Sequence, residues 1–176
     1  MTSAKRGRAR VLVVTGEGKG KTTAAAGILL RALGPGQKAR LVRFAKTAPS
    51  GEMAILSALP NLTVVSGDKG MTPPPDDPRF PAHAAAAREL FGRASAAAGD
   101  FDLIVLDEIL GVVARRMIAE GDVLAFLSAL RPEQAVILTG RGATPGIIDR
   151  ADTVSDIASV KHAYDAGIAA EPGIEY

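Results

Sequence analysis

The chain has 176 residues, a hydrophobic share of 47%, and 21 Lys+Arg against 19 Asp+Glu, which gives a formal net charge of +2. That length fits one domain over residues 1–176, and an aromatic share of only 4% means that the core is built mainly from Ala, Val, Ile and Leu. The absence of cysteine excludes a disulfide scaffold, a thiol nucleophile and a cysteine-bound metal, and two histidines are too few for a three-histidine zinc site.

The distribution of apolar and basic residues disfavours membrane and nucleic-acid partners. The longest nearly apolar stretch, Ala24 to Leu33, is well short of the ~20 residues that a membrane span needs. The basic start of the chain has no small-residue cleavage site and does not match a signal peptide. Much of the basic clustering lies in residues 1–9, which we expect to form a mobile tail rather than a nucleic-acid-binding arm. We therefore expect a cytoplasmic protein.

Strand-like apolar runs alternate with helix-like segments along the whole chain. In chain order the predicted segments are strand Arg10–Thr15, helix Lys21–Leu33, strand Ala39–Ala45, helix Glu52–Leu59, strand Leu62–Val65, a proline-rich loop over residues 67–81, helix Ala82–Ala98, strand Phe101–Leu106, helices Ile109–Ala119 and Val123–Leu130, strand Ala135–Thr139, helix Pro145–Arg150 and strand Thr153–Ile157. This alternation predicts the α/β class, with an open, mostly parallel sheet flanked by helices.

A glycine-rich segment lies directly between the first strand and the first helix. It matches the end of the P-loop pattern G-x-x-x-x-G-K-[ST], with Thr15 at the position of the leading glycine. Backbone N–H groups and the helix N-terminus converge there on an anionic phosphate chain. Lys21 adds a charge for the terminal phosphates, and the Thr22 hydroxyl is placed to bind Mg²⁺. We therefore predict a P-loop NTPase (RecA-like) architecture whose triphosphate site consists of Thr15, Gly16, Glu17, Gly18, Lys19, Gly20, Lys21, Thr22 and Thr23.

A later apolar strand ends in two carboxylates, Asp107 and Glu108. Because the carboxyl ends of parallel strands meet at one edge of the sheet, these carboxylates should face the P-loop and hold Mg²⁺ or its water shell together with Thr22. Asp107 could instead cap the helix that follows, which would leave Glu108 for the metal. We expect at least one of the two to act on the metal, and Glu108 is the favoured one.

Several motifs together resemble a known enzyme family. They are T-G-x-G-K-G-K-T-T-A-A in the P-loop, V-L-D-E at the acidic pair, T-G-R-G over residues 139–142, A-D-T-V-S over residues 151–155, and V-K-H-A-Y-D-A-G…G-I-E-Y over residues 160–176. The set resembles the P-loop type of ATP:cob(I)alamin adenosyltransferase, also called cob(I)yrinic acid a,c-diamide adenosyltransferase. The resemblance implies that the Co(I) of a reduced corrinoid attacks the ribose 5′-carbon of ATP and expels triphosphate, in cobalamin biosynthesis or salvage.

The same resemblance implies roles for individual residues and partners. Lys21, Thr22 and Glu108 would be catalytic, while Arg31, Lys161 and His162 would lie near the adenosine moiety. His162 could equally be structural, and Arg141 could either reach phosphate or bond neighbouring carbonyl groups. The substrates would be ATP with Mg²⁺ and the corrinoid. The expected partners are an electron-donating flavoprotein or reductase and a second copy of the chain in a homodimer.

On the corrinoid side, the sequence departs from the family pattern. Where the family carries an aromatic G-F-T-W-type segment, this chain has Gly70-Met71-Thr72-Pro73 followed by more prolines. Met71, Pro73 and Phe80 are the candidate replacements for the missing aromatic bulk, and the alternative is that the loop is a disordered surface excursion.

Two other functions share the P-loop and the acidic pair. A small-molecule kinase or generic P-loop NTPase would release ADP and would need an acceptor hydroxyl with a positioned base. A non-enzymatic ATP-binding regulatory module would show little or no turnover. The product of the reaction distinguishes all three.

Overall fold

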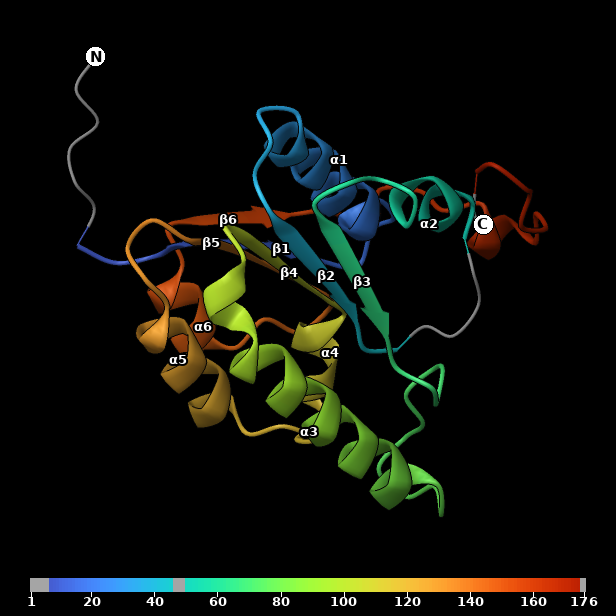
Figure 1. The fold of residues 1–176 in the computed structure, drawn as a ribbon. Helices are drawn as coiled ribbons and strands as arrows, with labels where there is room; N and C mark the ends of the chain where they lie inside the picture. The colour runs from blue at the N-terminus through green and yellow to red at the C-terminus, as the bar shows by residue number, and fades with distance from the viewer. Residues whose placement is uncertain (1–6, 46–49, 175–176) are drawn as a thin grey trace.

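The computed structural model describes residues 7–45 and 50–174, which form a parallel sheet with helices on both faces (Figure 1). The strands are β1 (Arg10–Thr15), β2 (Ala39–Arg43), β3 (Leu62–Ser66), β4 (Leu103–Asp107), β5 (Ala135–Thr139) and β6 (Thr153–Asp156). Their order in the sheet is β3-β2-β4-β5-β1-β6, and every pairing between neighbours is parallel. The predicted α/β class and mostly parallel sheet are therefore confirmed.

The helices divide between the two faces of the sheet. Their bounds are α1 (Lys21–Leu33), α2 (Gly51–Leu56), α3 (Phe80–Ala96), α4 (Ile109–Ala114), α5 (Glu120–Ala129) and α6 (Pro145–Arg150), with short 3₁₀ turns at Ala98–Asp100 and Tyr164–Ala166. In Figure 1, α1 and α2 cover one face, and α3, α4, α5 and α6 cover the other. Each face has its own apolar cluster, one built on α1 and α2, the other on the remaining helices.

Burial on both faces explains the continuous apolar runs of the strands. In β1, Val11 and Val13 pack toward α3–α6, whereas Leu12 and Val14 pack toward α1. Because successive side chains point to opposite faces, a strand covered on both sides needs apolar residues at nearly every position. Each such side chain contributes about 1.5–3 kcal/mol when fully buried.

The strand order places three sequence-distant strand ends side by side. β5 lies between β4 and β1, so the P-loop that follows β1 is separated from the acidic end of β4 by a single strand, as expected for a RecA-like P-loop fold. Strand order rather than sequence distance therefore brings the P-loop, Asp107 and Thr139 to one edge of the sheet.

Several predicted boundaries were wrong. The helix predicted over Ile109–Ala119 ends at Ala114, and Arg116 then adopts a left-handed backbone conformation, φ 58°. α3 begins at Phe80, inside the predicted proline-rich loop, because a proline such as Pro81 is well tolerated in the first turn of a helix.

The tail predicted over residues 1–9 is wrong at its end. Arg8 donates a 2.8 Å hydrogen bond to Asp152, and Ala9 is 1% exposed within the core. Residues 1–6 lie outside the described residues. Within the described part of the chain, no helix is long and apolar enough to cross a membrane.

Candidate active site at the carboxyl edge of the sheet

The P-loop runs from the end of β1 to the start of α1 and needs glycine for its backbone path. Gly16 and Gly20 have φ of 100° and 113°, a region that residues with a side chain rarely adopt. Gly20 immediately precedes α1, so the left-handed residue turns the loop into the helix N-terminus. The N-terminus of α1 therefore faces the loop, as the motif predicts.

A second reason for glycine is the chain that follows β6. The Gly18 N–H donates a 2.7 Å hydrogen bond to the carbonyl oxygen of Ile157. A side chain at Gly16 would lie 2.2 Å from the Asp156 Oδ1 atom, and one at Gly18 would lie 2.6 Å from the Ala158 carbonyl oxygen. The segment after β6 thus packs directly on the P-loop, a contact that the P-loop motif alone did not reveal.

The P-loop lysine folds back on its own loop. Lys21 is 8% exposed, and its Nζ donates 2.7 Å hydrogen bonds to the carbonyl oxygens of Gly16 and Gly18. These contacts place the ammonium group inside the curve of the loop, where a phosphate chain would pass. Thr23 is exposed one residue beyond the metal candidate Thr22.

The two acidic residues at the end of β4, Asp107 and Glu108, occupy different environments. Asp107 is fully buried, and its Oδ1 accepts hydrogen bonds from the Thr22 hydroxyl at 2.8 Å and the Thr139 hydroxyl at 2.7 Å. Glu108 precedes α4 in a left-handed conformation, φ 66°, and no side chain caps that helix. The alternative in which Asp107 caps that helix is therefore wrong, because its carboxylate bonds Thr22 and Thr139 instead.

The donor set fits a magnesium ion. Thr22 and Asp107 present a hydroxyl and a carboxylate, the hard oxygen donors that Mg²⁺ prefers, with the donor atoms 2.8 Å apart. Within the described residues no group of three or more His, Cys, Asp or Glu gathers into an all-protein metal cage. A site of one or two protein ligands completed by phosphate and water is the usual arrangement for Mg²⁺ with a nucleotide.

Two residues at this edge were missed by the sequence analysis. Thr139, at the end of β5, is fully buried and bonded to Asp107. Arg43, at the end of β2, is 4% exposed and stands in register with Asp107 on the neighbouring strand. The signal for each was present, since Thr139 opens the T-G-R-G motif and Arg43 is a charge inside an apolar strand.

Arg141 contacts the P-loop through Glu17. Its Nε lies 3.1 Å from the Glu17 Oε2 atom, and its Nη2 donates a 3.3 Å hydrogen bond to the Glu17 carbonyl oxygen. Arg141 therefore bonds a neighbouring carbonyl and the carboxylate of the same P-loop residue. Both side chains are more than half exposed, so solvent screens this ion pair. Lys19, also in the loop, donates a 2.6 Å hydrogen bond to the Ile174 carbonyl oxygen.

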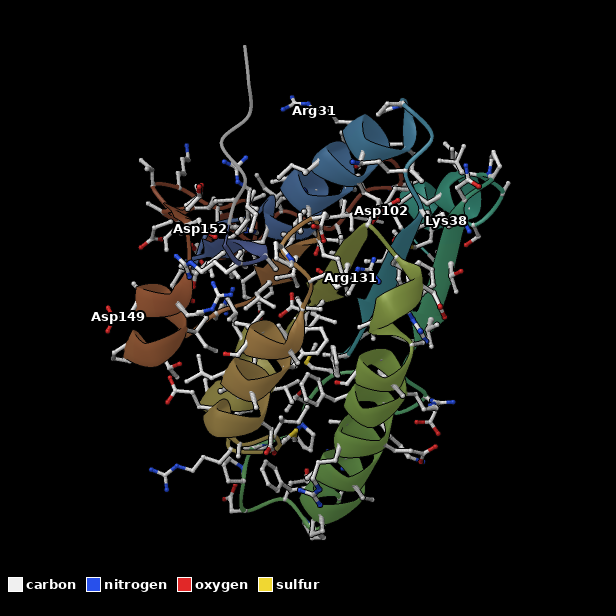
Figure 2. All side chains as sticks on the ribbon, turned by 60° about the vertical axis from the view of Figure 1, so that its left-hand side comes forward. Arg31, Lys38, Asp102, Arg131, Asp149 and Asp152 are labelled. Carbon is white, nitrogen blue, oxygen red and sulfur yellow. The ribbon has the colours of Figure 1, made fainter. Side chains whose placement is uncertain are left out.

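The residues expected near adenosine lie in different places. Lys161 is exposed in the segment after β6, and the His162 Nδ1 accepts a 3.2 Å hydrogen bond from the Tyr164 N–H. Arg31 is in the last turn of α1, about 15 Å along the helix axis from Lys21 at 1.5 Å per residue. Figure 2 shows Arg31 at the same end of the sheet as Lys38 and Asp102, which precede β2 and β4. The structure does not bring Arg31 to its own P-loop.

A cavity lies beside the proline-rich loop. It is small and open to solvent, and it is lined by Phe44, Gly67, Asp68, Lys69, Gly70, Thr72, His83, Ala86, Ala87, Leu90, Val112 and Met117. The three residues singled out in the sequence do not line it: Met71 is 87% exposed, Pro73 is buried, and Phe80 packs partly against the core. The Phe44 N–H donates a 3.1 Å hydrogen bond to the Asp107 carbonyl oxygen, so the cavity adjoins the acidic end of β4.

Comparison with known proteins adds a family match over nearly the whole chain. The family model described as ATP:corrinoid adenosyltransferase BtuR/CobO/CobP matches residues 7–176. The chain is 38% identical over 174 residues to the corrinoid adenosyltransferase of Escherichia coli K12, covering 96% of this chain and 86% of that protein. It is 40% identical over 172 residues to the corrinoid adenosyltransferase of Pseudomonas aeruginosa, covering 96% and 84%.

A third relative matches over a similar length, and a solved structure shares the fold. The corrinoid adenosyltransferase CobA of Salmonella typhimurium is 38% identical over 177 residues, covering 100% of this chain and 90% of that protein. The crystal structure of the KaiC-like protein PH0186 from Pyrococcus horikoshii superposes with a TM-score of 0.52 at 21% identity, covering 87% of this chain and 73% of that one. At that identity the likeness shows the fold alone.

Proposed function

The chain belongs to the ATP:corrinoid adenosyltransferase family, and on that premise we propose that the P-loop edge of the sheet holds MgATP while a corrinoid approaches from the side of the proline-rich loop. The reaction transfers the 5′-deoxyadenosyl group of ATP to Co(I) of the reduced corrinoid, in cobalamin synthesis. The cobalt electron pair forms the Co–C bond as the C5′–O bond breaks, and that bonding pair leaves with triphosphate.

This chemistry asks for positioning and charge stabilisation rather than for a general base. Co(I) attacks without losing a proton, so no activated nucleophile of the protein is required. The barrier falls mainly through stabilisation of the charge that develops on the departing triphosphate. Residues 15–23, with Lys21 at the centre of the loop, supply the donors for that purpose.

The single observation that carries the assignment of the site is the Thr22–Asp107 hydrogen bond. It joins the first turn of α1 to the end of β4 at 2.8 Å, which supports a metal site of hard oxygen donors beside the phosphate loop. Mg²⁺ bound there would neutralise part of the charge on the triphosphate. We assign Thr22 and Asp107 to the metal, with Glu108 beside them and Lys21 on the phosphates.

The corrinoid is proposed to use the cavity beside residues 67–72. Its apolar lining residues, which include Phe44 and Leu90, suit the edge of a macrocycle, and its polar lining residues, among them Lys69 and His83, suit amide or carboxylate side chains. Phe44 joins this cavity to Asp107 through one backbone hydrogen bond, so the two substrates would meet at the carboxyl ends of β2 and β4.

The remaining assignments are also part of the proposal. Residues 1–176 act as one domain in the cytoplasm, with Lys161, His162 and Arg141 around the nucleotide. Arg31 serves a nucleotide only if it belongs to another copy of the chain, because it lies at the opposite edge of its own sheet. A homodimer and an electron-donating flavoprotein or reductase complete the proposed system.

The test is anaerobic incubation of the whole protein with MgATP and chemically reduced cob(I)alamin. The corrinoid spectrum reports alkylation, and the released phosphate species are identified separately. Adenosylcobalamin with one equivalent of triphosphate supports the proposal. Release of ADP would indicate a kinase or generic NTPase, and ATP binding without any product would indicate a regulatory module. Repeating the assay with cobinamide compares an incomplete corrinoid with the complete one.

A further inference from the structure

A buried threonine contacts both acidic residues at the end of β4. Thr139 ends β5 and is fully buried, and its hydroxyl donates a 2.7 Å hydrogen bond to the Asp107 Oδ1 atom. The same hydroxyl oxygen accepts a 3.0 Å hydrogen bond from the Glu108 N–H. Thr139 therefore contacts the side chain of one acidic residue and the backbone of the next.

The chemistry of the donors fixes the direction of the three hydrogen bonds described for this group. A threonine hydroxyl has one proton, and Thr139 gives it to Asp107, since the Glu108 N–H can only donate. Thr22 also donates its proton to the same carboxylate oxygen at 2.8 Å. The Asp107 Oδ1 atom therefore accepts two hydrogen bonds and lies at the centre of the group.

This direction has a consequence for metal binding. When Thr22 donates its proton to Asp107, the lone pairs of the Thr22 oxygen are directed away from the carboxylate, as a metal ligand requires. The bond from Thr139 fixes the rotamer of the Asp107 carboxylate, and that rotamer sets where Asp107 accepts the Thr22 proton. Buried hydrogen-bond networks of this kind act as a unit. Residues that orient metal ligands from behind typically change metal affinity 10–100-fold when they are removed.

Thr139 also acts on the backbone of Glu108. Glu108 has a positive φ of 66°, uncommon for a residue with a side chain, and its N–H is bonded to Thr139 rather than left to solvent. That turn separates the end of β4 from the start of α4, so its backbone conformation sets the direction of the Glu108 side chain.

We propose that Thr139 is the positioning residue of the magnesium site, which holds Asp107 and the Glu108 turn in the geometry that presents the Thr22 oxygen to the metal. This inference rests on the proposed function for its nucleotide and its metal. Thr139 does not touch the substrate in this role, since its only proton is already donated to Asp107.

The test compares Thr139→Val, which keeps the shape and removes the hydroxyl, with Thr139→Ser, which keeps the hydroxyl. ATP affinity is measured across a Mg²⁺ titration by calorimetry. We expect Thr139→Val to need about 10–100-fold more Mg²⁺ for the same ATP affinity, with ATP binding in EDTA unchanged and Thr139→Ser close to the unmodified protein. The matched control is Thr153→Val, the same substitution at an exposed position on β6.

A second readout is independent of ligand. Amide hydrogen exchange at Glu108 should accelerate in Thr139→Val and return toward normal in Thr139→Ser, because the hydroxyl is the acceptor for that N–H. If Thr139→Val does not fold, as judged by circular dichroism, the same two measurements are made on Thr139→Ala, and Thr139→Ser still reports the rescue.

An unchanged Mg²⁺ dependence in a folded Thr139→Val protein would overturn the proposal. So would an equal loss in Thr139→Ser, which would point to packing rather than to the hydroxyl. Failure of the proposed function gives a different result: the unmodified protein would then form no adenosylcorrinoid, while the Mg²⁺ titration of ATP binding would still separate the two Thr139 variants.

Discussion

The phosphate side and the corrinoid side of this site are built in opposite ways. At the P-loop edge, Lys21 and Asp107 are buried; hydrogen bonds join Lys21 to its own loop and Asp107 to α1 and β5. In the proline-rich loop, Met71 is 87% exposed, and the main charged contact is local, between Asp77 and Arg79. A triphosphate needs hydrogen-bond donors at fixed positions, whereas a surface loop can contact a large macrocycle without such fixed donors. Substitutions on the phosphate side should therefore change ATP binding and adenosyl transfer, whereas substitutions on the corrinoid side should change KM for the corrinoid.

The largest effect is expected at the centre of the phosphate loop. Lys21→Ala removes the loop cation and its bonds to Gly16 and Gly18, and should lower kcat for adenosyl transfer by about 100-fold or more. Transfer is measured from the corrinoid spectrum with saturating reduced corrinoid. Lys38→Ala, an exposed lysine at the opposite edge of the sheet, is the control and should keep normal activity. Normal turnover in Lys21→Ala would refute the assignment of the phosphate site.

The acidic pair gives the next effect and distinguishes two neighbouring carboxylates. Asp107→Asn should weaken Mg²⁺-dependent ATP binding about 10–100-fold, because it disturbs the acceptor shared by Thr22 and Thr139. Glu108→Gln should have the smaller effect, since no hydrogen bond joins the Glu108 side chain to Thr22 in the described structure. Calorimetric titrations with and without Mg²⁺ measure both. The reverse order of effects would make Glu108 the main metal ligand, as the sequence favoured.

Gly18→Ala probes the contact between the P-loop and the chain after β6. The added methyl group would lie 2.6 Å from the Ala158 carbonyl oxygen and 2.7 Å from that of Ile157, so one segment must move. We expect a loss of about 1–3 kcal/mol in the free energy of unfolding together with a raised KM for ATP. Gly27→Ala is the matched control, because nothing lies near its added methyl group and alanine favours a helix. Equal stability of the two variants would show that the contact is easily displaced.

On the corrinoid side, Met71→Ala should leave the fold and the ATP site unchanged. An exposed side chain contributes within about 0.5 kcal/mol to stability, so a melting curve should barely move. If Met71 meets the corrinoid, KM for the corrinoid rises several-fold while KM for ATP stays constant. If neither constant changes, Met71 plays no part in the reaction.

The smallest effect concerns pH and the loop before α3. The Arg79 guanidinium bonds the Asp77 carboxylate and lowers the pKa of Asp77 from 3.8 to about 2. Since the folded-state pKa is the lower one, this stabilisation is present above about pH 4 and is lost as the pH falls toward 2. Asp77→Asn should therefore melt slightly lower at neutral pH and equally near pH 2. A difference that persists in acid would mean that the ion pair is not its cause.

The sequence predicted the P-loop edge better than the corrinoid side for a physical reason. The glycines, Lys21 and Thr22 lie within eight consecutive residues, so one local motif predicts the loop. The strand before it and the helix after it are predicted from the adjoining sequence. Thr139 and Arg43 reach the site only through strand order, which periodicity does not encode. The cavity beside Phe44 depends on packing between β2, α3 and α4, and the three loop residues chosen from the sequence are not among its lining.

The position of β1 in the sheet has a consequence for the synthesis of the protein. Both neighbours of β1 come from the last third of the chain, β5 at Ala135–Thr139 and β6 at Thr153–Asp156. At about 5–20 residues per second, a ribosome takes roughly 6–25 s after making β1 to reach β5. During that interval RVLVVT is an apolar strand without its partners, and the phosphate loop has no scaffold. A nascent chain that ends before residue 135 should not bind ATP, and its β1 has no strand to pair with. That unpaired apolar strand makes the incomplete chain the form most exposed to aggregation and most dependent on chaperones.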